Sequence, residues 1–289
     1  MAAFAGCGYD YEIVFINDGS KDATLHNLKK IHAAQKCPVK VISFSRNFGK
    51  EAGLYAGLQY ASGEYISLID ADLQQRPEIV RDMVKILDEQ PEYDVVAAYQ
   101  DRRREGKVLS FFKKSFYAII NQLSDVTLQP DASDFRTFRR SVRDSILELR
   151  EYHRFSKGIF AWVGYETKWL EFENVERVAG ETKWSFWKLF KYSIEGIVAF
   201  TTTPLTLASV MGFLMCLLAF FSTVFIVVRK LLFGDPVSGW ASTASIITFI
   251  GGLQLFFMGI FGQYLAKAYT EIKNRPIYIV AESNLEKER

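Results

Sequence analysis

The sequence predicts an α/β domain, built on a mostly parallel sheet with helices on both faces, followed by two long apolar helices. Up to residue 98, apolar runs of about five residues alternate with longer helical stretches, which is typical of βαβ units. Later in the chain, residues 199–228 and 236–266 contain no charged side chain. The 289 residues therefore combine a soluble domain large enough for its own core with a membrane module.

Composition excludes several classes of protein. With 35 Lys and Arg against 33 Asp and Glu, the net charge of +2 gives no reason to expect a nucleic-acid partner. A hydrophobic share of 49% excludes a disordered or collagen-like chain. The three cysteines, Cys7, Cys37 and Cys216, lack the spacing of zinc ligands or of a disulfide framework, and residues 1–8 lack the basic start of a signal peptide. We therefore expect the soluble part to stay in the cytoplasm.

The predicted strands end in acidic motifs. Strands are expected at 12–17, 39–43, 65–69 and 94–98, with helices between them. Asp18 follows the first strand, and Asp70 and Asp72 follow the third. In such sheets ligands bind beyond the carboxyl ends of the strands, so these carboxylates are expected at one site.

Asp70 and Asp72, separated by one residue, predict a cation site. Two carboxylates at a strand end suit Mg²⁺ or Mn²⁺, and a diphosphate would complete the coordination shell. An Asp-X-Asp sequence alone is also compatible with a surface turn. Its position after an apolar strand favours the metal and diphosphate.

The charge-free segments predict a membrane hairpin. Residues 206–228 and 241–266 are long enough to cross the bilayer, and the linker 229–240 is short. Basic residues flank the outer ends, so both termini are expected on the cytoplasmic side. Residues 183–200 combine Trp and Lys at helical spacing, which predicts an interfacial amphipathic helix. Glycines within the two spans would let these helices pack closely or form a homo-oligomer.

Several motifs in one order resemble family 2 glycosyltransferases of the GT-A fold. The further match is to the polyprenyl-phosphate type, which includes bactoprenol glucosyltransferases and is related to dolichyl-phosphate mannose synthase. The motifs that carry this resemblance are 15–20 (FINDGS), 45–51 (SRNFGKE), 70–74 (DADLQ), 131–136 (DASDFR), 153–155 (HRF), 180–185 (GETKWS) and 273–278 (KNRPIY).

The resemblance implies inverting transfer of a hexose from a nucleotide-sugar donor to undecaprenyl phosphate, for cell-envelope glycan modification. UDP-glucose and UDP-N-acetylglucosamine are the favoured donors. It also implies a multi-pass protein of the bacterial inner membrane, in contact with the lipid bilayer. The expected segments are a GT-A domain at 1–182, the interfacial helix at 183–200, spans at 206–228 and 241–266, an external loop at 229–240 and a cytoplasmic tail at 267–289.

Site residues follow from the same resemblance, position by position. Asp134 is expected near the reacting centre, either as a base or as an orienting group. The other expected roles are nucleotide-sugar binding by Asp18, Arg46, Lys50 and Asp70; metal binding by Asp70, Asp72 and Gln74; and phosphate or acceptor contact by Arg102, Arg103, Arg136 and Lys183. The run at 102–104 is equally compatible with a solvated loop.

One departure from the family concerns the first strand. Family members begin with an apolar strand some forty residues before the Asp-Gly-Ser motif, and the sequence shows none ahead of residue 12. That strand would lie between the strands at 12–17 and 65–69, so we expect these two to lack a shared partner and the activity to be impaired. The alternative function is a non-catalytic membrane partner or scaffold that retains the fold. A processive polysaccharide synthase is disfavoured because its Gln-X-X-Arg-Trp motif is absent.

Overall fold

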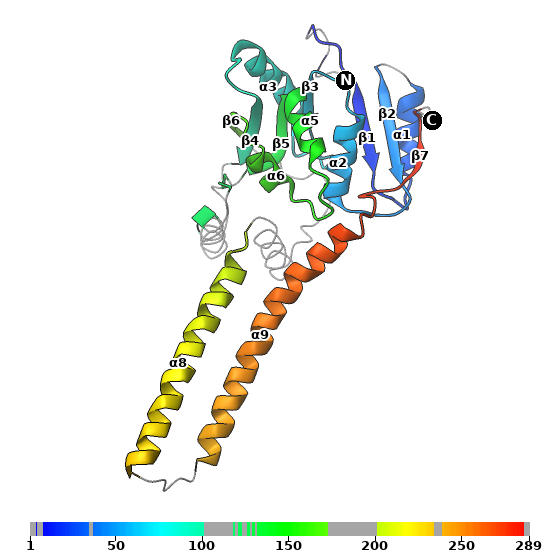
Figure 1. The fold of residues 1–289 in the computed structure, drawn as a ribbon. Coiled ribbons are helices and arrows are strands. Elements are labelled where there is room, and N and C mark those ends of the chain that lie inside the picture. The colour runs from blue at the N-terminus through cyan, green and yellow to red at the C-terminus, as the bar shows by residue number, and fades with distance from the viewer. Residues whose placement is uncertain are drawn as a thin grey trace.

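Figure 1 shows the fold of the protein in a computed structural model. The described residues are 4, 8–34, 37–100, 118, 121–122, 126–127, 129–130, 132–172, 201–233 and 239–285. They form two sheets with flanking helices and, extending away from the sheets, a pair of long helices.

The first sheet contains β1 (Ile13–Asn17), β2 (Val39–Phe44) and β7 (Val280–Ser283), in the order β1-β2-β7. β1 and β2 are parallel, as expected for the connection through α1 (Thr24–Ala33). β7 is antiparallel to β2 and comes from the segment predicted to be a tail. The chain end therefore returns to the sheet after the long helices.

The second sheet has the order β3-β5-β4-β6. Its strands are β3 (Tyr65–Leu68), β4 (Val95–Gln100), β5 (Ala132–Arg139) and β6 (Thr167–Phe172). β4 and β6 are parallel, whereas β5 is antiparallel to both of its neighbours. The four strands predicted from the sequence are present, but the pairing is mixed because β5 and β7 run against them.

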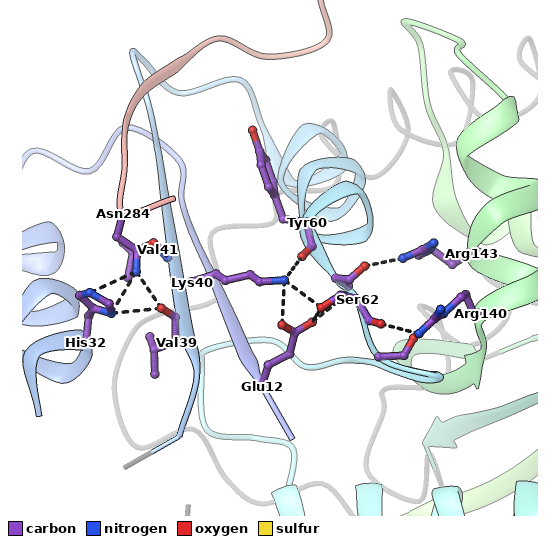
Figure 2. Close-up of polar contacts among 12 residues, drawn as sticks. Glu12, His32, Val39, Lys40, Val41, Tyr60, Ser62, Arg140, Arg143 and Asn284 are labelled. Atoms are coloured by element: carbon purple, nitrogen blue, oxygen red, sulfur yellow. Dashed lines mark hydrogen bonds and ion pairs between the residues drawn. The ribbon is translucent and has the colours of Figure 1, made fainter. Parts of the chain in front are cut away.

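β1 and β3 lie at edges of different sheets. Within the described residues, β1 pairs only with β2, and β3 pairs only with β5. A cluster of hydrogen bonds around residues 60–63 instead joins the part of the chain that contains the first sheet to the part that contains the second sheet (Figure 2).

This junction is centred on Lys40 of β2. Its Nζ lies 2.7 Å from Oε2 of Glu12 and donates to the carbonyl of Tyr60 at 2.7 Å and to Oγ of Ser62 at 3.0 Å. The Ser62 amide donates to Glu12 at 2.6 Å. From the second half, Arg140 donates to the carbonyl of Ser62 (Figure 2). Burial would raise the pKa of Glu12, but the bonds from Lys40 and Ser62 outweigh it and lower that pKa.

Helices cover both faces of the second sheet. On one face, α3 (Pro77–Glu89) presents apolar side chains at helical spacing to Phe135 and Phe172. On the other face, α5 (Arg140–Glu148) and α6 (Ser156–Trp162) pack around Phe138. Because neighbouring residues of a strand point to opposite faces, Asp134 and Arg136 share the Phe138 face of β5.

The long helices are α8 (Thr203–Phe233) and α9 (Trp240–Ile272), which contain both predicted spans. Within them, Thr203–Ile226 and Phe249–Ile272 are long and apolar enough to cross a membrane. Their large apolar side chains are exposed, with Phe225 and Leu255 at 65% and 76%. The expected interfacial helix at 183–200 lies outside the described residues.

The segment after α9 is fastened to the first sheet. The Asn284 side chain accepts from the Val41 amide at 2.7 Å and donates to the Val39 carbonyl at 2.7 Å, in the manner of a strand backbone (Figure 2). Tyr278 stacks on Phe44 with ring centroids 4.7 Å apart. These contacts tie the segment that follows α9 to β2.

Candidate active site

The candidate site lies where β3 ends and β5 begins. The last pair in their antiparallel ladder is Leu68 with Arg136. Asp70 follows β3 by two residues and Asp134 precedes Arg136 by two, so the antiparallel pairing brings both to the same end of these strands, although they are far apart in the sequence. The structure thus brings Asp134 and Asp70 together, and their predicted roles stay predictions.

Lys50 joins these two carboxylates. It is the first residue of α2 (Lys50–Tyr60), and its Nζ lies 2.6 Å from Oδ2 of Asp134 and 3.0 Å from Oδ2 of Asp70. Burial would lower the pKa of Lys50, but the charge of Asp134 and then that of Asp70 outweigh it, so the pKa is raised. Lys50 is therefore a cation at neutral pH, held between two anions.

Asp134 is the more enclosed of the two carboxylates, with a side chain 20% exposed against 36% for Asp70. Burial would raise its pKa, but the charges of Lys50, Lys157 and Arg136 hold it below the usual value. Asp134 is thus a carboxylate anion and a weak base at neutral pH.

Gln75 braces the loop that carries Asp70. The Asp70 amide donates to Oε1 of Gln75 at 2.8 Å, and Nε2 of Gln75 lies 3.5 Å from Oδ2 of Asp70. In the same loop the Gln74 amide donates to Oδ1 of Asp72 at 3.2 Å, and Leu73 adopts a φ of 63° while 68% exposed. A non-glycine residue at positive φ indicates that the loop conformation is imposed by its surroundings.

The donor types in this loop fit a hard divalent cation. Asp70, Asp72 and Gln74 offer carboxylate and amide oxygens, the ligands that Mg²⁺ and Mn²⁺ prefer. Asp70 and Asp134 already enclose the ammonium of Lys50, so the site attracts positive charge. No group of three or more His, Cys, Asp or Glu side chains able to hold a metal occurs among the described residues. A cation here would therefore depend on a diphosphate and water for further ligands.

Asp18 fastens the loop that leads into α2. Its two carboxylate oxygens accept from the amides of Phe48 at 2.6 Å and Gly49 at 3.0 Å. Asp18 thereby positions Lys50, and its predicted contact with the nucleotide stays a prediction. Arg46, in the same loop, is exposed and lies over the Phe48 ring at 4.5 Å. Its predicted contact with the nucleotide also stays a prediction.

Arg136 is buried beneath the site rather than at its surface. It is 4% exposed, stacks on Phe160 at 4.1 Å and donates from Nη2 to the Ser133 carbonyl at 2.9 Å. Its Nε has no hydrogen-bond partner among the described residues. Burial lowers the pKa of Arg136 to about 10, against the opposing charge of Asp134, so it is a cation at neutral pH. Its predicted phosphate contact stays a prediction.

Four other predicted cations, Arg102, Arg103, Arg104 and Lys183, lie outside the described residues.

Sequence reasoning missed Glu51, Gln75 and Ser156. Glu51 was inside a recognised motif, and its position beside Lys50 was the only available signal. Gln75 stood out only as a departure from the Asp-Pro-Pro that the family resemblance predicts at 75–77, outside the predicted metal ligands, and nothing distinguished Ser156 from an ordinary loop residue. His153, within the motif at 153–155, has Nε2 2.7 Å from Oγ1 of Thr270 on α9.

Comparison with known proteins identifies the family of this chain. The glycosyl transferase family 2 profile matches residues 2–147. The putative glycosyltransferase CsbB of Bacillus subtilis is 41% identical, aligned over 98% of this chain and 85% of that protein. The SfII prophage-derived bactoprenol glucosyl transferase of Shigella flexneri is 38% identical over 96% of this chain and 89% of that protein.

Among solved structures, the mannosyltransferase PcManGT from Pyrobaculum calidifontis aligns with 90% of this chain and 77% of its own, at 13% identity and a TM-score of 0.40. The family assignment depends on the profile and on the curated relatives. Because both match, this chain belongs to glycosyltransferase family 2.

Proposed function

We propose that the protein transfers a hexose from a nucleotide sugar to a polyprenyl phosphate at the membrane. The observation that carries the proposal is the Asp70–Lys50–Asp134 cluster at the shared end of β3 and β5. The name of the Shigella flexneri relative supports glucose as the sugar and bactoprenol phosphate as the acceptor. UDP-glucose is the favoured donor, with UDP-N-acetylglucosamine next.

On the donor side, Asp70, Asp72 and Gln74 would hold Mg²⁺ or Mn²⁺ against the diphosphate. The ion would neutralise charge that develops on the leaving nucleoside diphosphate. Lys50 lies close enough to these groups to contribute a second positive charge. Arg46 would contact the nucleotide portion.

On the acceptor side, the chemistry requires little proton transfer. A phosphate monoester has its second pKa near ~6, so it is already largely a dianion at neutral pH. One of its oxygens would form the new bond to the anomeric carbon, while the bond from that carbon to the diphosphate breaks. Asp134, a weak base paired with Lys50, would therefore orient the centre instead of removing a proton.

The two long helices support delivery of a lipid acceptor. Their apolar surfaces are exposed, and each contains a stretch of 24 residues that suits a bilayer. We propose that both helices cross the membrane and that the two sheets and both termini lie on the cytoplasmic side. Residues 183–200 would lie at the membrane surface between the domain and α8.

The test is to incubate membranes containing the protein with undecaprenyl phosphate and a panel of labelled UDP- and GDP-sugars. A labelled lipid is expected with UDP-glucose or UDP-N-acetylglucosamine. Asp134→Asn should abolish it, whereas Glu89→Gln, which alters an exposed ion pair on α3, should not. Absence of any lipid product across the panel would favour the non-catalytic scaffold.

A further inference from the structure

The loop between α5 and α6 connects the end of a long helix with the candidate active site. We propose that residues 151–156, called the strap here, are clamped by Glu51 at one end and Glu271 at the other, and that the strap positions the Lys50–Asp134 pair. Glu51 is then a positioning residue for the transfer reaction. This inference is built on the proposed function, and its test includes a measurement that does not require activity.

Glu51 fastens the C-terminal end of the strap. Its Oε2 accepts from the Ser156 amide at 2.9 Å and also from the Ser156 hydroxyl. Ser156 is only 8% exposed, and burial raises the pKa of Glu51. An enclosed carboxylate that accepts two hydrogen bonds is costly to displace, so this contact restrains both partners.

Glu51 is adjacent to Lys50 in the first turn of α2. Movement at Glu51 would therefore be transmitted through one peptide unit to the residue that joins Asp70 and Asp134. On the strap side, Ser156 is followed by Lys157, whose charge acts on Asp134. Glu51 and Ser156, which bond to each other, are thus each the sequence neighbour of a cation of the candidate site, Lys50 and Lys157.

Glu271, in the last turn of α9, fastens the other end of the strap. Its carboxylate accepts from the Tyr152 amide at 3.0 and 3.1 Å and from the His153 amide at 3.2 Å. The His153 ring adds the contact with Thr270. Hydrogen bonds to a charged acceptor are stronger than neutral ones, so the strap is attached to α9 and not merely adjacent to it.

The middle of the strap packs against α2. The Arg154 guanidinium lies 4.4 Å from the centroid of Tyr55, which is buried on α2, and Arg154 also donates to the Leu149 carbonyl. Phe155 is buried as well. With both ends bonded and the middle packed, displacement at α9 is expected to reach Ser156 and Glu51 rather than dissipate in a free loop.

The first experiment uses the full-length protein in lipid nanodiscs with Glu51→Gln, Glu271→Gln, the double variant and the control Glu89→Gln. Because misplacement of reacting groups by about 1 Å costs up to ~10²-fold, we expect each single variant to lower kcat roughly tenfold or more. The KM for the donor and the Kd for UDP should stay as in the wild type. The double variant should lose less than the product of the single losses, since both act through one strap.

Three results would overturn the proposal. The first is a kcat for Glu51→Gln equal to that of Glu89→Gln, and the second is a fall in kcat accompanied by comparable losses of UDP affinity and thermal stability. The third is a loss in the double variant equal to the product of the two single losses. Rescue gives a further check, because Ser156→Thr keeps the hydroxyl and should retain more kcat than Ser156→Ala.

Hydrogen exchange separates this inference from the proposed function. Glu271→Gln should speed amide exchange at Tyr152 and His153, and also at Ser156, which Glu271 does not touch. Faster exchange at Ser156 supports the strap even if no sugar is transferred by the wild type. Exchange at Ser156 unchanged from that of Glu89→Gln would contradict it.

Discussion

Gly19→Ala adds only one methyl group, but it should disrupt the candidate site. Gly19 has a φ of +64°, and a Cβ there would lie 2.6 Å from the Asn47 amide nitrogen and 2.8 Å from Cα of Arg46. Both are backbone atoms, so no side chain can move aside. The loop before α2 would have to shift away from Asp18.

The magnitude follows from two contributions. The left-handed conformation costs an alanine about 1–2 kcal/mol. Displacement of the loop weakens the two hydrogen bonds from Phe48 and Gly49 to the Asp18 carboxylate, each worth about 1.5–3 kcal/mol. The total of roughly 4–8 kcal/mol approaches the whole stability of a typical domain, about 5–15 kcal/mol.

Gly164→Ala is the matched control. Gly164 has a similar φ of +71°, but the nearest atom to its Cβ position is 3.9 Å away, so only the backbone strain remains. At about 2–4 °C per kcal/mol, its melting temperature should fall by a few degrees, whereas Gly19→Ala should lose over ~10 °C. Thermal unfolding followed by near-UV circular dichroism measures both. Equal losses in the two variants would refute the close approach between Gly19 and residues 46–47.

Three further predictions concern the metal, acid stability and topology. Asp72→Asn should abolish turnover while expression persists, and EDTA should do the same reversibly on addition of Mn²⁺; full activity in EDTA would contradict a metal-held diphosphate. The lowered pKa of Glu12 means its stabilisation is complete above about pH 4.5 and is lost as pH falls through the lowered value, so Glu12→Gln should reduce the melting temperature at about pH 7, and this reduction should shrink as the pH is lowered below about 4.5. In a cysteine-free background, a thiol reagent outside intact cells should label Asp235→Cys but not Ala281→Cys, and the reverse pattern would invert the proposed topology.

The strands and the acidic ends were predictable because they are local. Apolar runs predicted β1 to β4, and the carboxylates after β3 followed from strand position alone. β7 was not predicted, although its first two residues continue an apolar run from Ile277, because its pairing with β2, over 200 residues earlier, has no local signal. β5 was missed because Asp134, Arg136 and Arg139 give it a polar, loop-like sequence.

The candidate site was predictable in its members more than in their contacts. Asp134 came only from the resemblance to a family, because no local pattern linked it to Asp70. That Lys50 lies between them depends on the packing of α2 against two strands. The role of Gln75 also depends on a loop conformation that turns its side chain back toward Asp70.

The central claim is that a hexose passes in one displacement from the nucleotide to a polyprenyl phosphate. The most direct measurement is NMR of the lipid product formed by the purified protein from UDP-glucose, whose anomeric linkage is α. A single attack by the acceptor phosphate predicts a β-linked polyprenyl-phosphate glucose, formed by the wild type and absent with Asp134→Asn. An α-linked product, or glucose released to water with no lipid product, would contradict the account.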